Sequence, residues 1–146
     1  MADLDHFKAV NDTWGHLAGD AVLRDVSDRL RQGLRRNEAV GKYGGEEFLI
    51  LLPLCSFSIA RTRAEELRVA IQACTIPISG REIAVTCSFG IAEYEPGCSI
   101  EELIGKADAA LYVAKNKGRN CVWPGEDHDS KPMLEQDSVA PAPDFH

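Results

Sequence analysis

The stretch Lys42-Tyr-Gly-Gly-Glu-Glu-Phe48 decides how this chain is interpreted, because it predicts a β-hairpin with acidic residues at its tip. Ala39-Val40 precedes it as one strand, and the apolar run Phe48-Leu-Ile-Leu-Leu52 follows as a second, buried strand. Gly44 and Gly45 can adopt the positive φ that a tight hairpin turn needs. Two glycines also let a phosphate approach the backbone closely, so the turn is a candidate phosphate contact.

Two carboxylates, Glu46 and Glu47, stand side by side at this turn. Adjacent carboxylates repel each other, so a divalent cation that neutralises them would explain the pair. A solvated acidic turn is the alternative that the hairpin by itself leaves open.

The start of the chain carries the residue types that nucleotide binding requires. Asp3 ends a strand stub, where a third carboxylate can join the hairpin tip in a hard oxygen site for Mg²⁺. Lys8 is a point charge suited to phosphate. Asn11 and Asp20 together offer the acceptors and donors that complement the edge of guanine.

Each of these residues also has a structural interpretation. Asp5 or Asn11 can cap or end a short helix, and Gly19-Asp20 can be the turn and N-cap before the next helix.

Composition limits the function classes. The 146 residues suffice for one domain with a core, and the net charge of −7 disfavours a nucleic-acid partner. The five cysteines lack C-x-x-C spacing, which predicts reduced thiols in a cytoplasmic protein. The sequence has no apolar run long enough to span a bilayer and no signal-peptide pattern at its start, so we expect a soluble segment without membrane contact.

Periodicity predicts an α+β fold, with a mostly antiparallel central sheet flanked by helices. A capping box at Ser99-x-x-Glu102 opens the last helix, and Gly118 closes it. A hairpin turn is expected at Ser79-Gly80. Helices are predicted over residues 18–34, 57–74 and 100–117, and further strands over 83–93 and 121–123. From residue 124 to 146 Pro, Asp, Glu and Ser dominate, which predicts a disordered tail.

Taken together, the ordered blocks of the chain resemble the GGDEF domain of diguanylate cyclases, in its GGEEF variant. The blocks are Asp3-Leu-Asp-His-Phe-Lys8, Asn11-Asp-Thr-Trp-Gly-His16, Gly19-Asp20, Tyr43-Gly-Gly-Glu-Glu-Phe48, Val85-Thr-Cys-Ser-Phe-Gly-Ile91, and Ala107-Asp-Ala-Ala-Leu-Tyr-Val-Ala-Lys115 with Gly118-Arg-Asn120. The resemblance implies a palm-like, ferredoxin-related nucleotidyl cyclase fold over residues 1–123. It also implies that the N-terminal helix and most of the first strand are missing, that Asp3 is left on a frayed end, and that an upstream sensor domain belongs to the full-length protein.

The same resemblance implies an enzyme that joins two GTP molecules into cyclic di-GMP, releases two pyrophosphates and serves bacterial second-messenger signalling. It implies a homodimer, because each active site holds one GTP. Asp3, Glu46 and Glu47 would be catalytic, with Asp3, the Leu4 carbonyl and Glu46 binding Mg²⁺ or Mn²⁺ and Glu47 next to a second ion. The remaining implied substrate contacts are Asn11 and Asp20 for guanine and Lys8, Lys115, Arg119 and the backbone at His6, Phe7, Gly44 and Gly45 for phosphates.

Many relatives carry an inhibitory product site with the pattern Arg-x-x-Asp. Here Arg35 is kept, but Glu38 stands where Asp is expected, which predicts weak product inhibition because the longer acid moves its carboxylate.

Two alternatives stay open at this stage. The domain can bind GTP without turnover and act as a regulatory or docking module, or it can make products that contain adenine. Asp20 argues against the second alternative, because a carboxylate there favours the N–H donors of guanine.

Overall fold

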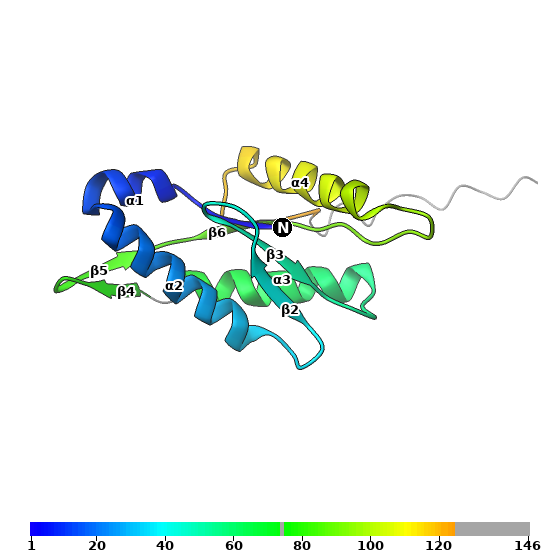
Figure 1. Ribbon diagram of the computed structural model, residues 1–146, viewed down its shortest axis with the longest axis horizontal. Helices are drawn as coiled ribbons and strands as arrows, with labels where there is room; N and C mark the ends of the chain where they lie inside the picture. Colours follow the sequence, from blue (N-terminus) through cyan, green and yellow to red (C-terminus); the bar gives the residue numbers. More distant parts are fainter. Residues whose placement is uncertain (74, 125–146) are drawn as a thin grey trace, which may run out of the picture.

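The computed structural model describes residues 1–73 and 75–124, whose fold is a five-stranded sheet with helices on both faces (Figure 1). The strands lie in the order β2-β3-β1-β6-β7, and every neighbouring pair is antiparallel except β6 and β7. This confirms the predicted α+β class. The strands of the sheet are β1 (Ala2–Leu4), β2 (Ala39–Lys42), β3 (Glu47–Leu51), β6 (Cys87–Gly90) and β7 (Val122–Trp123).

Helices on opposite faces of the sheet cover alternating side chains of the strands. The helices are α1 (Phe7–Trp14), α2 (His16–Gly33), α3 (Phe57–Gln72) and α4 (Ile100–Asn116). In Figure 1, α4 lies on one side of the sheet, and α2 and α3 lie on the other. Ala2 and Phe48 belong to the large core cluster with residues of α2 and α3, whereas Met1 and Leu49 pack with Ala107 of α4. This alternation puts Asp3 on the face that α4 covers.

The short strand β1 is central, because it pairs with β3 on one side and with β6 on the other. Asp3 lies opposite Glu47 in one register and opposite Ser88 in the other, and only 8% of its surface is exposed. The expectation that Asp3 sits on a frayed end is therefore wrong, because two neighbouring strands and α4 hold it.

Helix ends follow local sequence. Ser99 and Glu102 form the predicted capping box at the start of α4, and Gly118 has φ 115° just after its end. Ser56 accepts a hydrogen bond from the Ile59 N–H and opens α3. The predicted end of α3 at residue 74 is too late, because the helix stops at Gln72 and residue 74 lies outside the described residues.

The predicted long strand over residues 83–93 is wrong. Residues 81–84 form β5 (Arg81–Ala84), which pairs with β4 (Thr75–Ile78) in a separate two-stranded sheet, and β6 begins only at Cys87. The predicted turn at Ser79-Gly80 is confirmed, and both residues have positive φ, as a two-residue hairpin loop requires. The apolar alternation across Val85 and Cys87 hid the break, because both residues are buried in the same core cluster.

Two details of the β2–β3 hairpin also differ from expectation. Gly44 and Gly45 are not among the residues with positive φ. Instead, a side chain on Gly44 would overlap the carboxylate of Glu47, so the glycine leaves room for that carboxylate. Leu51 is 54% exposed, so the strand is not buried along its whole length.

The tail was predicted over residues 124–146, and residues 125–146 of it lie outside the described residues. Over the part of the chain that is described, the structure has no helix long and apolar enough to cross a membrane.

Candidate active site

The hairpin tip and the end of β1 lie against each other. The Leu4 N–H donates a 3.2 Å hydrogen bond to the Glu46 carbonyl, one residue beyond the Asp3–Glu47 pair. Glu46 and Glu47 are half-buried, and their negative charges act on Asp3. The three predicted catalytic carboxylates are therefore brought together from two segments of the chain.

A cation from the far end of the chain joins this acidic cluster. Lys115, in the last turn of α4, donates a hydrogen bond from Nζ to Oδ1 of Asp3. Burial raises the pKa of Asp3, Lys115 opposes that rise, and the charges of Glu46 and Glu47 add to it. The net result is a pKa of Asp3 above its ordinary value, with burial as the largest cause.

The expected metal ligands lie on adjacent segments, but their side chains do not converge on one point. In residues 1–73 and 75–124 no group of three His, Cys, Asp or Glu side chains is placed to hold a metal ion. The donor types nonetheless suit a hard cation, since Asp3, Glu46 and the Leu4 carbonyl all offer oxygen. Lys115 provides the positive charge beside Asp3 in this arrangement.

The two predicted guanine readers lie on the two helices that meet at a corner, Asn11 on α1 and Asp20 on α2. Gly15, with φ 84°, joins α1 to α2, so that Asn11 on α1 faces the start of α2. The side chain of Asn11 lies directly on Gly19, where any Cβ would overlap Asn11 Oδ1. Asp20 follows Gly19 and is exposed. Gly19 and Asp20 are inside α2 and do not form a turn, and the absence of a Cβ on Gly19 leaves room for the side chain of Asn11.

The candidate phosphate contacts near α1 differ in their exposure. His6 has φ 56° and precedes α1 without a side-chain cap. The Phe7 side chain is buried in the core, so only its backbone N–H can face a ligand. Lys8 is exposed and pairs with Asp12 at 2.8 Å.

The site also contains a residue that the sequence indicated only as a possible helix cap. Asp5 is buried and accepts hydrogen bonds from Thr86, Ser88 and the Asn120 backbone. Asp5 lies in the turn just after β1, and its three hydrogen-bond donors come from residues 86, 88 and 120, so no local pattern in the sequence indicates this role.

Arg35 and Glu38, the candidate product site, lie at the other end of the hairpin. The Glu38 side chain is 5% exposed, and Arg63 of α3 contacts both of its oxygens, at 3.3 and 2.9 Å. The Arg35 N–H also donates to Glu38 at 2.7 Å. Arg63 lowers the pKa of Glu38, so this carboxylate is charged and already satisfied.

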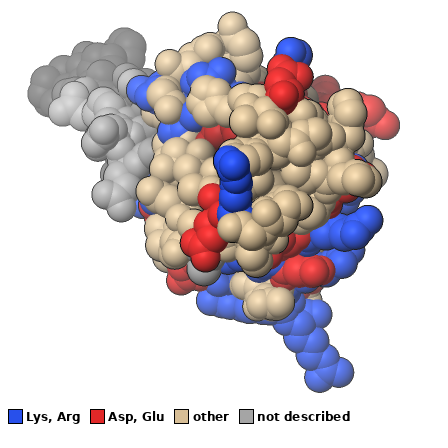
Figure 2. Space-filling view, turned by 90° about the vertical axis from the view of Figure 1, so that its left-hand side faces the viewer, with Lys and Arg blue, Asp and Glu red and all other residues tan. Residues whose placement is uncertain are grey.

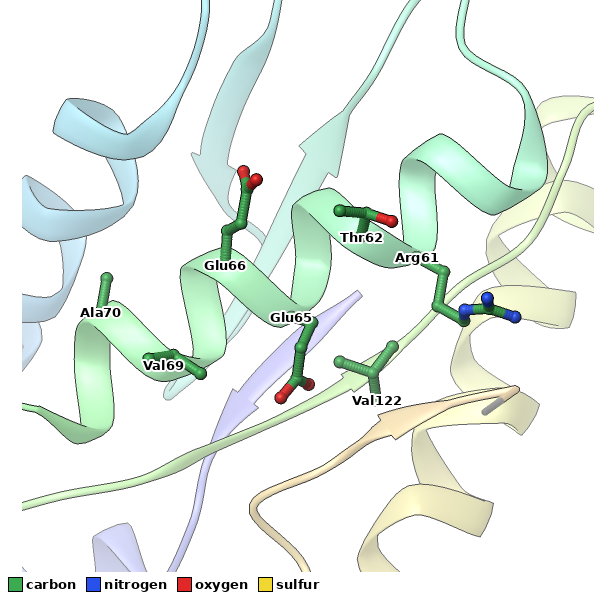
Figure 3. Close-up of a pocket in the computed structure, with 7 residues that line it drawn as sticks. All are labelled: Arg61, Thr62, Glu65, Glu66, Val69, Ala70 and Val122. Atoms are coloured by element: carbon green, nitrogen blue, oxygen red, sulfur yellow. The ribbon is translucent and has the colours of Figure 1, made fainter. Parts of the chain in front are cut away.

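Two hollows in the surface lie away from the carboxylate cluster. One, of about 690 Å³, is formed by α3 and Val122 of β7 (Figure 3), and the other, of about 650 Å³, is mostly apolar and includes Met1, Leu49 and Ile100. Neither includes Asp3, Glu46 or Asp20 in its lining. The candidate site is therefore identified by its charged side chains and not by a pocket.

On the face that carries α1 and the β4–β5 hairpin, Lys and Arg atoms are interspersed with Asp and Glu (Figure 2). The four cysteines among the described residues are all free.

A family model described as "Diguanylate cyclase, GGDEF domain" matches residues 1–121. The chain belongs to the GGDEF family. The stretch Gly44-Gly-Glu-Glu-Phe48 differs from the five letters of the family's name only at Glu46, where the name has Asp.

Known GGDEF proteins cover most of this chain. It is 46% identical over 127 residues to diguanylate cyclase VdcA of Vibrio cholerae, covering 85% of the chain and 38% of VdcA. It is 45% identical over 120 residues to diguanylate cyclase DgcP of Pseudomonas aeruginosa, covering 82% of the chain and 18% of DgcP. The crystal structure of the GGDEF domain of DgcB from Caulobacter crescentus in complex with c-di-GMP matches with a TM-score of 0.79 and 40% identity, over 83% of this chain and 72% of that one. The chain thus spans less than two fifths of the length of these two curated relatives.

Proposed function

We propose that this chain is the catalytic domain of a diguanylate cyclase, which condenses two GTP molecules into cyclic di-GMP and releases two pyrophosphates. The observation that carries the proposal is the meeting of Asp3, Glu46 and Lys115 from three distant segments. A carboxylate cluster beside a lysine is the set of charges that a metal-bound triphosphate complements.

In this proposal the acidic residues hold the metal. Asp3, the Leu4 carbonyl and Glu46 would bind Mg²⁺, with Mn²⁺ as a possible substitute, and Glu47 would lie next to a second ion. When bound, Mg²⁺ supplies neutralisation of the charge that develops at the α-phosphate and activation of the attacking 3′-hydroxyl.

The basic residues and the helical corner hold the nucleotide. Lys115 leaves Asp3 for the phosphates when substrate enters, so that each charge exchanges one partner for another and neither stays unpaired. Arg119 and Lys8 add phosphate contacts, together with backbone N–H groups at His6 and Phe7. Asn11, whose side chain lies against Gly19, and the neighbouring residue of that glycine in the chain, Asp20, read guanine.

The proposed domain covers residues 1–123, acts as a homodimer so that two GTP molecules face each other, and follows an upstream sensor domain in a longer bacterial protein. We place it in the cytoplasm, where GTP is available and thiols stay reduced. Strong product inhibition is not expected, because Arg63 already occupies both oxygens of Glu38.

The test is to incubate the purified protein with GTP and Mg²⁺ and to identify cyclic di-GMP by mass, with Glu46→Gln as the inactive control. Parallel reactions with Mn²⁺ and with ATP test the choice of metal and of base. Binding of GTP without product would favour the alternative of a regulatory module that does not turn over, and formation of adenine-containing products would contradict the assignment of Asn11 and Asp20.

A further inference from the structure

The loop after α4 has an unusual backbone conformation. Gly118, Arg119 and Asn120 have φ of 115°, 66° and 46°, so three consecutive residues lie in the left-handed region. Only the first is a glycine. Residues with a side chain disfavour this region, and a loop of this kind persists only when surrounding contacts hold it.

Two residues from other elements hold Asn120. Its backbone N–H donates a 2.9 Å hydrogen bond to Oδ2 of Asp5, at the end of β1. Its side-chain Oδ1 accepts a 2.7 Å hydrogen bond from Nη1 of Arg68 on α3. Asn120 is therefore fixed through both its backbone and its side chain.

Both carboxylate oxygens of Asp5 already accept hydrogen bonds from the protein. It is 4% exposed, and its Oδ1 accepts from Ser88 at 2.7 Å while its Oδ2 accepts from Thr86 at 2.7 Å as well as from Asn120. A buried carboxylate with these partners is an anchor for the loop and not a ligand for a metal.

Arg68 is itself held by α3. Its Nε and Nη2 donate to the two carboxylate oxygens of Glu65 at 2.9 and 2.6 Å, in a bidentate pair. Figure 3 shows Glu65 on the side of α3 that faces Val122 of β7, whereas Glu66 points the other way. The guanidinium therefore reaches Asn120 from a fixed position.

The end of β1 thus holds the segment 115–120 at two points. Asp3 contacts Lys115, and Asp5 contacts the loop that carries Arg119. We propose that Asp5 and Arg68 are positioning residues that set the direction of Arg119 toward the phosphates of the nucleotide. This inference rests on the proposed function, because it takes Arg119 as a phosphate contact.

The test is a double-mutant cycle between Arg68 and Arg119, read as the Kd of a GTP analogue with an α,β-methylene bridge in the presence of Mg²⁺. The bridge prevents cleavage, so binding is measured without turnover. We expect Arg68→Met and Arg119→Ala each to weaken binding about 5- to 20-fold, and the double variant to bind no more weakly than Arg119→Ala. Arg31→Met, which removes an exposed arginine paired with Asp28 on α2, is the matched control and should bind like the parent.

Two further variants distinguish a positioning role from a general loss of folding. Asp5→Asn keeps the shape but cannot accept all three hydrogen bonds, so it should weaken binding only when Arg119 is present. Arg68→Lys should recover part of the affinity, since it restores one donor. Thermal melts of every variant verify that the protein is folded at the assay temperature.

Independent, multiplying effects of Arg68→Met and Arg119→Ala would overturn the inference, as would an Arg68→Met variant that binds like Arg31→Met. A parent protein that binds the analogue but forms no cyclic di-GMP would contradict only the proposed function. A parent that does not bind the analogue would overturn both.

Discussion

The two ends of the β2–β3 hairpin carry the same residue type in opposite states. At its base, Glu38 is 5% exposed and Arg63 contacts both of its oxygens. At its tip, Glu46 and Glu47 are half-buried, and within residues 1–73 and 75–124 no basic side chain forms an ion pair with either. A satisfied glutamate stabilises the fold, whereas an unpaired one next to other carboxylates is available to a ligand.

The difference shows why residue type is a poor guide to role within this hairpin. Both glutamates lie at positions that the sequence predicted to contact a ligand: Glu46 as a proposed metal ligand and Glu38 in the proposed degenerate product site. Glu38 differs from Glu46 because Arg63, which is 25 residues away from Glu38 in the chain, binds its carboxylate. Removing Glu38 should therefore affect stability, and removing Glu46 should affect catalysis.

Removing Arg63 should produce the largest effect on this comparison. We expect Arg63→Met to lower the free energy of unfolding by about 3 to 5 kcal/mol, because it leaves a charged Glu38 buried without its partner. Urea denaturation measures this change. Arg31→Met breaks an exposed ion pair and should change stability by no more than about 1 kcal/mol. Equal losses in the two variants would show that the Glu38 contact is not special.

The tip glutamate should show the reverse behaviour. We expect Glu46→Gln to reduce turnover on the order of 10² to 10³-fold while the melting temperature stays close to that of the parent, because its charge acts on the transition state. Steady-state kinetics with GTP and thermal melts measure both quantities. Glu93→Gln, at another exposed glutamate, should leave both unchanged. Normal turnover of Glu46→Gln in excess Mg²⁺ would refute the assignment.

The base-reading residues should show a smaller and more selective effect. Asp20→Ser removes the acceptor for the N–H donors of guanine, so the preference for GTP over ATP should fall by roughly 1 to 3 kcal/mol. The ratio of kcat/KM values for the two nucleotides measures this preference. Asp28→Ser, on the same helix and paired with Arg31, is the control. An unchanged ratio in Asp20→Ser would mean that guanine is recognised elsewhere.

The smallest expected effect is a change of stability with pH at the hairpin base. Arg63 lowers the folded-state pKa of Glu38 below the ordinary value of about 4.3. The Glu38 contact therefore stabilises the protein fully above that ordinary pKa and is lost as the pH falls through the folded-state pKa. Parent and Glu38→Gln should differ most in unfolding free energy near neutral pH and converge once the pH falls below the folded-state pKa of Glu38. A difference that does not vary with pH would contradict an ionic role for Glu38.

The contact between Glu38 and Arg63 changes the effect expected from a substitution at the candidate product site. Replacing Glu38 with Asp restores the family's residue type, but the shorter side chain would also withdraw from Arg63. We therefore expect Glu38→Asp to weaken this contact before it gains any affinity for product. Calorimetry with cyclic di-GMP on Glu38→Asp and on Arg35→Ala measures the outcome.

Features that depend on neighbouring residues were predictable from the sequence. The capping box of α4 and the Ser79-Gly80 turn both rest on residues close together in the chain, where local backbone preferences decide the conformation. The split of residues 83–93 into β5 and β6 was missed, because pairing partners decide where a strand ends and an apolar alternation does not reveal them.

By itself, the sequence determined the family, the fold class and the residue types available for nucleotide chemistry. Only the tertiary structure decided which of the acidic residues are free. Asp3 meets a lysine 112 positions away, Asp5 anchors a loop 115 positions away, and Glu38 is held by Arg63. The availability of a carboxylate depends on the charges and donors within a few ångströms of it, and the fold sets those neighbours by bringing distant segments together.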